Sequence, residues 1–310
     1  MTIYWGEKRY YSLDYYLKQT YGRKIYKISL DAGMTCPNRD GTSGFRGCIF
    51  CSQGGSGDFA ADRKLPITRQ LEQGRAQIRQ KYPGSSYIAY FQAYTNTYAP
   101  VSYLRKVFTE AIRHPDVEIL DIATRPDCLG WEVLALLHEL NQIKPVWVEL
   151  GLQTIHPKSA GFIRRGYELP VFDQAVHDLR RLHIPVIVHT ILGLPGEDME
   201  QMLATVRYLN AQDIQGIKFQ LLHILEQTDL AAYYKMHPFP LPDMEEYFEI
   251  IGNCLCTLRP DIVVHRLTGD GPKPLLIAPL WTGSKRQVLN QMHAYLKRHD
   301  LWQGKTFSAS

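Results

Sequence analysis

The segment Cys36-Pro-Asn-Arg-Asp-Gly-Thr-Ser-Gly-Phe-Arg-Gly-Cys48-Ile-Phe-Cys51 holds three of the chain's six cysteines. Glycines at positions 41, 44 and 47 divide it, so we expect a loop here and neither a helix nor a strand. Three thiolates on one loop favour a metal site. A closed zinc site or a fully ligated iron–sulfur cluster takes four protein ligands. Three cysteines therefore leave one metal position open.

The spacing of these cysteines, C-x11-C-x2-C, resembles the cluster loop of the radical S-adenosylmethionine (radical SAM) superfamily. The wide first gap, with Cys-Pro-Asn-Arg-Asp-Gly before it and Gly-Cys-Ile-Phe-Cys after it, is similar to one subfamily. That subfamily is related to the radical SAM domain of the Elongator catalytic subunit and includes the YtqA/MnmL-type proteins of tRNA wobble-uridine modification. The resemblance runs along nearly the whole chain.

The resemblance implies two cofactors. Cys36, Cys48 and Cys51 would bind a [4Fe–4S] cluster, and S-adenosyl-L-methionine would chelate the open iron. A one-electron donor such as flavodoxin or ferredoxin would then trigger formation of a 5′-deoxyadenosyl radical, which removes hydrogen from an unactivated carbon. The protein's part is to position the target C–H bond and to exclude water.

Two alternatives for the cysteine loop stay open. It could hold zinc with a fourth ligand from elsewhere, such as a histidine or Cys128. It could also form a disulfide, which a reducing compartment disfavours. The remaining cysteines, Cys128, Cys254 and Cys256, lie in apolar surroundings and are interpreted as ordinary buried residues.

Size and composition are those of a globular protein. The 310 residues, 45% of them hydrophobic, suffice for one large domain, alone or with an appendage. A net charge of +4 is compatible with an RNA partner without requiring one. We find no signal peptide or long apolar run and expect a cytoplasmic protein that does not enter a membrane. The oligomeric state is not visible in the sequence.

Tyrosines and basic residues are interleaved in the first 26 residues. Such a pattern can bind nucleic acid by stacking and ion pairing. The alternative is an amphipathic helix that packs its tyrosines on the rest of the fold. Both interpretations remain open from the sequence.

Apolar β-forming segments alternate with helical segments through most of the chain. After an N-terminal helix at 13–21, the predicted strands are 24–30, 87–91, 117–123, 145–151, 185–192 and 216–222, and the predicted helices between them are 67–81, 101–113, 131–141, 171–182 and 199–211. Such repetition predicts a parallel sheet. The expected fold is α/β, a partial (β/α)6 TIM-like barrel.

We expect three parts: an N-terminal extension (1–23), the radical SAM core (24–242) and a C-terminal segment over the barrel mouth (243–310). In the last part, a helix at 244–258, a strand at 261–267 and a helix at 284–298 are predicted. The strand could extend the sheet as a seventh member.

Polar clusters follow five of the predicted strands, and catalytic residues of such barrels lie at that end. Each cluster could also be a turn or a helix cap: residues 124–127 could cap the helix near Trp131, and Pro195-Gly196 suits a type II turn. By resemblance, the residues facing S-adenosylmethionine are Tyr94, Thr95, Asn96, Thr97, Glu149, Gln153, Gly193, Pro195, Leu222 and Ile224. No catalytic side chain is assigned beyond the cluster and this cofactor.

The substrate follows from the resemblance alone. It implies tRNA, with 5-carboxymethylaminomethyl-(2-thio)uridine converted to the 5-aminomethyl form. Candidate substrate-contacting residues are Arg125, Arg266, Asp270 and Lys285, while residues 54–59 match the subfamily without a role that we can assign. Two other hypotheses are a radical SAM enzyme acting on a small or porphyrin-like molecule and a zinc-bearing RNA-binding protein without catalysis.

Overall fold

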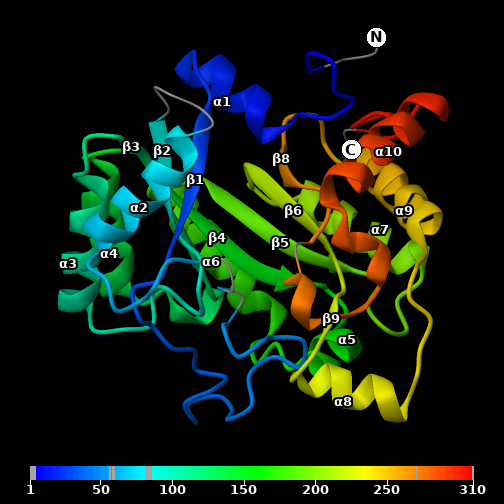
Figure 1. Cartoon of the computed structure of the whole chain (residues 1–310), viewed down its shortest axis with the longest axis horizontal. Coiled ribbons are helices and arrows are strands. Elements are labelled where there is room, and N and C mark those ends of the chain that lie inside the picture. The colour runs from blue at the N-terminus through cyan, green and yellow to red at the C-terminus, as the bar shows by residue number, and fades with distance from the viewer. Residues whose placement is uncertain (1–4, 56, 58–59, 81–85, 270, 309–310) are drawn as a thin grey trace.

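A sheet of seven parallel strands forms the centre of the protein. The computed structural model describes residues 5–55, 57, 60–80, 86–269 and 271–308. The strands lie in chain order across the sheet: β1 (Ile25–Leu30), β2 (Ser86–Phe91), β3 (Val117–Thr124), β4 (Val146–Gln153), β5 (Val186–Leu192), β6 (Gly216–Leu221) and β8 (Val263–Arg266). The sheet curls into a half-barrel with β1 and β8 as its edges (Figure 1). The predicted partial barrel is thus confirmed, and β8 is the seventh strand.

Helices cover the outer face of this sheet (Figure 1). The helices of the described residues are α1 (Leu13–Tyr21), α2 (Ile67–Arg79), α3 (Val101–Ile112), α4 (Trp131–Asn141), α5 (Pro157–Phe162), α6 (Leu169–Arg181), α7 (Met199–Asn210), α8 (Asp229–Met236), α9 (Met244–Thr257) and α10 (Lys285–Arg298). Of these, α1 lies at one end of the barrel, α8 packs on β7 and α10 packs on α9. The outward side chains of the strands, such as Phe91, Ile122 and Val148, are buried in the main hydrophobic core. Each such side chain contributes about 1.5–3 kcal/mol when fully buried.

The main differences from the predicted elements lie outside the regular βα repeats. Helices α5 and α8 were not predicted, nor was a small antiparallel sheet of β7 (Ile224–Leu225) and β9 (Leu276–Ala278). The proposed capping of α4 by residues 124–127 is wrong, because Gly130 precedes that helix and makes no side-chain cap. The predicted helix end at Lys81 lies outside the described residues. Division of the chain at residues 23 and 242 stays a prediction.

The inward side chains of the half-barrel form three layers, because residues two apart on a strand share a face. The lowest layer is apolar and contains Ile25, Ile88, Ile119, Trp147 and Ile187. Two residues further along the same strands stand Lys27, Tyr90, Asp121, Glu149 and His189, which we call the ionic layer together with Lys218 of β6. Two residues further again, the strands reach the mouth of the barrel.

Helix α1 closes the lower end of the barrel. Ser12 caps the helix by accepting a hydrogen bond from the backbone N–H of Tyr15. Leu17 is buried against the apolar layer, and the Tyr16 ring lies 6.0 Å from that of Trp147. The N-terminal helix therefore packs at least one of its tyrosines on the barrel, as the second interpretation of this segment expected. Figure 1 shows the barrel with this lower end at the top of the view, so α1 lies at the upper edge and the cysteine loop at the lower edge.

Candidate active site

The cysteine loop, residues 36–51, follows β1 at the mouth of the barrel and contains neither helix nor strand, as predicted. Gly41 and Gly47 have φ of 98° and 73°, which side chains rarely adopt. The Asn38 amide donates to the carbonyl of Arg164 at 2.7 Å and lies 3.5 Å from the Cys48 sulfur. Such contacts shape the loop before any metal binds.

The segment after β2 holds the flanks of this loop. The backbone N–H of Thr95 donates to Thr35 just before Cys36, and that of Tyr94 donates to Gly55 just after Cys51. A Cβ on Gly55 would stand 2.5 Å from the Tyr94 ring, and Gly55 has a φ of 58°. This contact explains one glycine of the 54–59 segment. Residues 56, 58 and 59 lie outside the described part of the chain.

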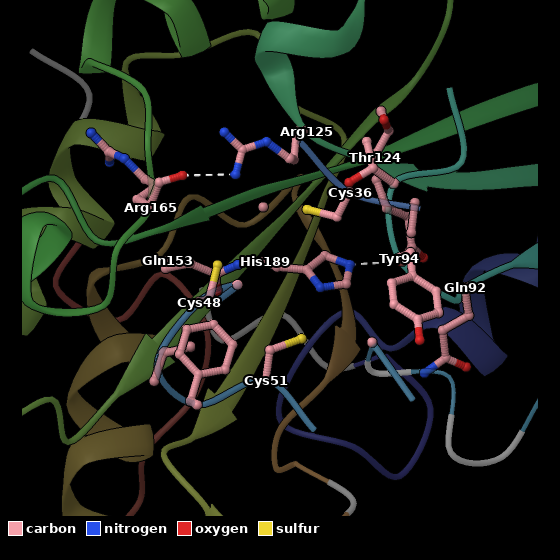
Figure 2. A pocket seen from close by; sticks show the side chains of 18 of the residues that line it. Cys36, Cys48, Cys51, Gln92, Tyr94, Thr124, Arg125, Gln153, Arg165 and His189 are labelled. Atoms are coloured by element: carbon pink, nitrogen blue, oxygen red, sulfur yellow. Dashed lines mark hydrogen bonds and ion pairs between the residues drawn. The ribbon is translucent and has the colours of Figure 1, made fainter. Parts of the chain in front are cut away.

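A cavity of about 170 Å³ lies between the loop and the upper strand ends. Figure 2 shows Cys36, Cys48 and Cys51 around it. Among the predicted site residues, those lining it are Cys36, Cys48, Cys51, Tyr94, Thr95, Arg125, Glu149, Gln153 and Arg266. Because they come from five separate segments, only the fold brings them together. We call this cavity the cysteine pocket.

Other predicted residues lie outside the cysteine pocket. Asn96 and Thr97 are buried beside it, where the Asn96 amide donates to the carbonyls of Phe91 and Ala123. Gly193, Pro195, Leu222, Ile224 and Lys285 do not line it, and Asp270 lies outside the described residues. Pro195-Gly196 forms the predicted turn, with the Glu197 N–H donating to Leu194. The roles assigned to these residues stay predictions.

Arg125 and Gln153 both line the pocket, but they differ in whether their polar side-chain atoms have hydrogen-bond partners. The Arg125 guanidinium donates to both carboxylate oxygens of Asp127 at 2.7 and 2.9 Å. It also donates to the carbonyl of Arg165 at 2.8 Å (Figure 2). Gln153 has a φ of 68°, and its buried Oε1 has no hydrogen-bond partner in the described structure. An orphaned buried acceptor next to a cavity suits a ligand that donates a hydrogen bond.

The floor of the pocket is the ionic layer, centred on Glu149. This carboxylate is fully buried and accepts hydrogen bonds from Lys27 (2.8 Å), Tyr90 (2.7 Å), His189 (2.6 Å) and Lys218. Lys27 also donates to Asp121 at 2.5 Å. The ammonium groups of Lys27 and Lys218 each lie about 4.5 Å from the centroid of the Tyr90 ring. Glu149 therefore has partners on both oxygens.

Burial and charge set the protonation states of this layer. Burial alone would raise the pKa of Glu149, but Lys218, Lys27 and His189 hold it well below its usual range. Burial lowers the pKa of His189 to about 4, with Lys218 adding to the shift and Glu149 opposing it. His189 is thus a neutral donor to Glu149. Its Nδ1 then accepts from the Gln220 amide at 3.1 Å.

A second hollow, of about 260 Å³, adjoins the cysteine pocket. The two share Phe50, Gln92, Ile191, Gln220 and Arg266, and the second is also lined by Leu222, His223 and Gly269. Because the Gln220 Nε2 donates to His189, its Oε1 is left as an acceptor at the boundary between the hollows. Two molecules bound there would therefore lie next to each other.

The family of the chain follows from its similarity to known proteins. A family model described as the radical SAM superfamily matches residues 41–209, and one described as the radical SAM C-terminal domain matches residues 214–298. The chain belongs to the radical SAM superfamily. Radical SAM enzymes use a [4Fe–4S] cluster together with S-adenosylmethionine.

Three known proteins illustrate what the chain is similar to. YtqA of Bacillus subtilis (strain 168) is 42% identical over 301 residues, covering 97% of this chain and 94% of YtqA. A tRNA uridine(34) acetyltransferase of Methanocaldococcus jannaschii is 25% identical over 186 residues, which are 59% of this chain and 33% of that protein. The solved structure of Methanocaldococcus infernus Elp3 has a TM-score of 0.68 at 15% identity and covers 90% of this chain and 64% of that chain, a likeness of fold.

The residues of the cysteine pocket fit the radical SAM cofactors. Three thiols face one cavity, the buried Gln153 acceptor is unpartnered, and polar strand ends surround them. Within the described residues, no three His, Cys, Asp or Glu side chains are grouped as a site for a single metal ion. Cys128 lines a neighbouring surface groove and does not line this pocket. None of the helices in the described residues has the length and apolar composition for a membrane crossing.

The ionic layer was not predicted as a group, and of its members only Glu149 was assigned to the site, although the signal of the layer is present in the sequence. A single polar or charged residue stands two positions after an apolar one in the middle of successive strands, as in Ile25-Tyr-Lys27, Ile119-Leu-Asp121 and Ile187-Val-His189. The signal cannot be seen in a single strand, because each strand carries only one such residue. Aligning the strands by their apolar layer brings the charges to one level.

Proposed function

We propose that this radical SAM enzyme modifies the wobble uridine of tRNA. The kinship just described carries this proposal: one relative is a tRNA uridine(34) acetyltransferase, and the similarity to YtqA extends over 97% of the chain. The proposed conversion is of 5-carboxymethylaminomethyl-(2-thio)uridine to 5-aminomethyl-(2-thio)uridine. A cytoplasmic location and a flavodoxin- or ferredoxin-like donor belong to the same proposal.

In this proposal the cysteine pocket holds the cofactors. Cys36, Cys48 and Cys51 would bind the cluster, and Tyr94, Thr95 and Gln153 would face S-adenosylmethionine. When bound, the two cofactors supply the one-electron chemistry that removes a hydrogen atom from an unactivated carbon. Bringing the target carbon and the cofactor to adjacent positions is then the main contribution of the protein.

The second hollow would receive the uridine. The acceptor Oε1 of Gln220, oriented by His189, stands where it could meet an N–H of the base. Beneath both hollows, the ionic layer and the apolar layer packed on α1 fill the barrel. The protein's own residues thus bind, orient and exclude water, and none of them needs to act as a base.

Nucleoside mass spectrometry tests the proposal. In a strain lacking the gene, total tRNA should accumulate the 5-carboxymethylaminomethyl form and lose the 5-aminomethyl form, and the intact gene should reverse this. The control strain carries the Cys48→Ala variant, which should behave like the deletion. An unchanged profile in the deletion strain would reject the tRNA assignment and leave a radical SAM enzyme with another substrate.

A further inference from the structure

A third hollow, of about 380 Å³, opens at the side of the half-barrel between its edge strands β1 and β8. The N-terminal segment crosses this seam, where the backbone N–H of Val264 donates to the carbonyl of Tyr11 at 2.7 Å. Helix α10 borders the same hollow through Lys285 and Leu289. We call it the seam hollow. It lies outside the cysteine pocket, but Arg266 lines both.

The seam hollow is strongly cationic. The charged side chains among its described lining residues are Lys8, Lys24, Lys27, Arg266, Lys285 and Asp14. The one carboxylate, Asp14, is already paired with Lys18 at 2.9 Å. Burial lowers the pKa of Lys8; Asp14 opposes this shift, and the charges of Lys18 and Lys24 add to it. Lys27 is already paired with Asp121 and Glu149 of the ionic layer. Lys8, Lys24, Arg266 and Lys285 still outnumber the one carboxylate among the described lining residues, so an anion would be attracted to the hollow.

Unpartnered polar atoms face the same space. Thr268 is 2% exposed and lines the seam hollow, and its hydroxyl has no hydrogen-bond partner in the described structure. His265 also lines it, with an unpartnered buried Nδ1. A buried hydroxyl without a partner is rare and suits a ligand with acceptor oxygens.

The start of α10 adds to the positive field. This 14-residue helix begins at Lys285, and the side chain of Ser284 before it makes no capping hydrogen bond. The first backbone N–H groups of a helix and its dipole favour anions, phosphate above all. With Thr268 and the lysines, the helix start gives the seam hollow the donors of a phosphate site.

We propose that the seam hollow binds the phosphodiester backbone of RNA. This inference rests on the proposed tRNA function and adds a binding place for the RNA backbone next to the reacting nucleoside. Arg266 lines the cysteine pocket, the second hollow and the seam hollow. A nucleotide whose base occupies the second hollow would therefore have its phosphate within reach of the seam. Lys285, a candidate substrate-contacting residue in the sequence, lines this hollow.

Binding of a fluorescently labelled tRNA transcript, followed by anisotropy on the anaerobic holoenzyme, tests this proposal. The Lys8→Gln/Lys285→Gln variant should bind about tenfold more weakly, and the slope of log K against log salt should fall by about 1–2, since each lost phosphate contact removes about 0.7–0.9. The matched control, Lys106→Gln/Lys297→Gln, removes two exposed lysines from α3 and α10 and should bind like the parent. Equal binding by the two double variants would overturn the proposal.

Lysine acetylation of the parent protein decides the matter if the seam variant does not fold. Bound tRNA should protect Lys8 and Lys285 severalfold, as read by mass spectrometry, and leave Lys106 and Lys297 unchanged. Equal modification with and without bound tRNA would overturn the seam assignment. If the nucleoside profile of the deletion strain changes but the seam residues are not needed for tRNA binding, the seam proposal is wrong and the proposed function stands. If the parent binds tRNA through the seam and the profile does not change, the chemical assignment fails alone.

Discussion

The ionic layer and the cysteine pocket lie on the same strands, one level apart, yet differ in how their polar groups are satisfied. In the ionic layer, Glu149 accepts from four donors, and Asp121 accepts from Lys27 through one oxygen while its Oδ1 has no partner in the described structure. In the cysteine pocket, the Gln153 Oε1 has no partner in the described structure, and Tyr94 and Gln153 have φ of 60° and 68°. Satisfied buried groups support the fold, whereas unsatisfied and strained ones mark where a ligand binds. The comparison predicts that the network around Glu149 holds the barrel and that Gln153 faces a ligand.

The largest effect is expected at the cysteine pocket. Cys48→Ala should abolish the cluster and with it the formation of 5′-deoxyadenosine from S-adenosylmethionine, because two thiolates cannot hold three irons. Iron and sulfide analysis after anaerobic purification measures the loss. Cys128→Ala is the matched control, since Cys128 lines a different groove, and it should keep full iron content. Loss of metal in the Cys128 variant would instead point to a fourth protein ligand, as in the zinc alternative.

In the ionic layer, Glu149→Gln should destabilise the fold by about 3–5 kcal/mol, because it leaves Lys27 and Lys218 buried without their shared partner. Urea unfolding measures the change. Lys218→Met in the same chain should recover part of the loss, as a double-mutant cycle would show. If Glu149→Gln left stability unchanged and abolished cofactor binding, Glu149 would belong to the cysteine pocket functionally, as the resemblance implied.

Acid should weaken the ionic layer through His189. Its pKa in the fold is about 4 and its ordinary value 6.5, so the unfolded chain binds more protons between these values. Stability is then fully present above pH 6.5 and falls as the pH drops toward 4, by about 2–3 kcal/mol. His189→Gln should flatten this dependence in urea titrations from pH 4 to 7. The control His177→Gln, on the exposed face of α6, should leave the slope as in the parent.

A smaller effect is expected at Gln153. Gln153→Gly removes the unpartnered acceptor but keeps the left-handed backbone, so affinity for S-adenosylmethionine should fall about tenfold, or about 1.4 kcal/mol. Anaerobic calorimetry measures it. Gln227→Gly is the matched control, because Gln227 has a φ of 62° and lies outside the cysteine pocket. Equal affinities in the two variants would remove Gln153 from the cofactor site.

The regular part of the fold could be predicted because its signal is local. Each strand of the repeat is a short apolar run between turns, and its helix carries its own apolar stripe, so α4 and α1 have the predicted bounds. The small sheet of β7 and β9 could not be found this way. Its strands have two and three residues, about 50 positions apart, and only the tertiary fold pairs them.

The candidate site was predictable to the extent that its residues are adjacent in the chain. The spacing of the three cysteines can be seen in the sequence and indicates a common site, and the three cysteines line one pocket. The partners of Glu149 come from β1, β2, β5 and β6, and nothing in a single strand reveals how these meet across the barrel. Lys285 was a candidate substrate-contacting residue and lines the seam hollow, which the sequence could not show, because the direction in which α10 begins is set by packing and not by its sequence pattern.

The central claim is that three cysteines at the barrel mouth leave one iron of a cubane cluster open to S-adenosylmethionine. Mössbauer spectroscopy of anaerobically purified, ⁵⁷Fe-enriched protein tests it most directly. The account predicts a [4Fe–4S] spectrum in which one of the four iron sites changes when S-adenosylmethionine is added. A spectrum without such a cluster, or one in which no iron site responds to S-adenosylmethionine, would contradict it.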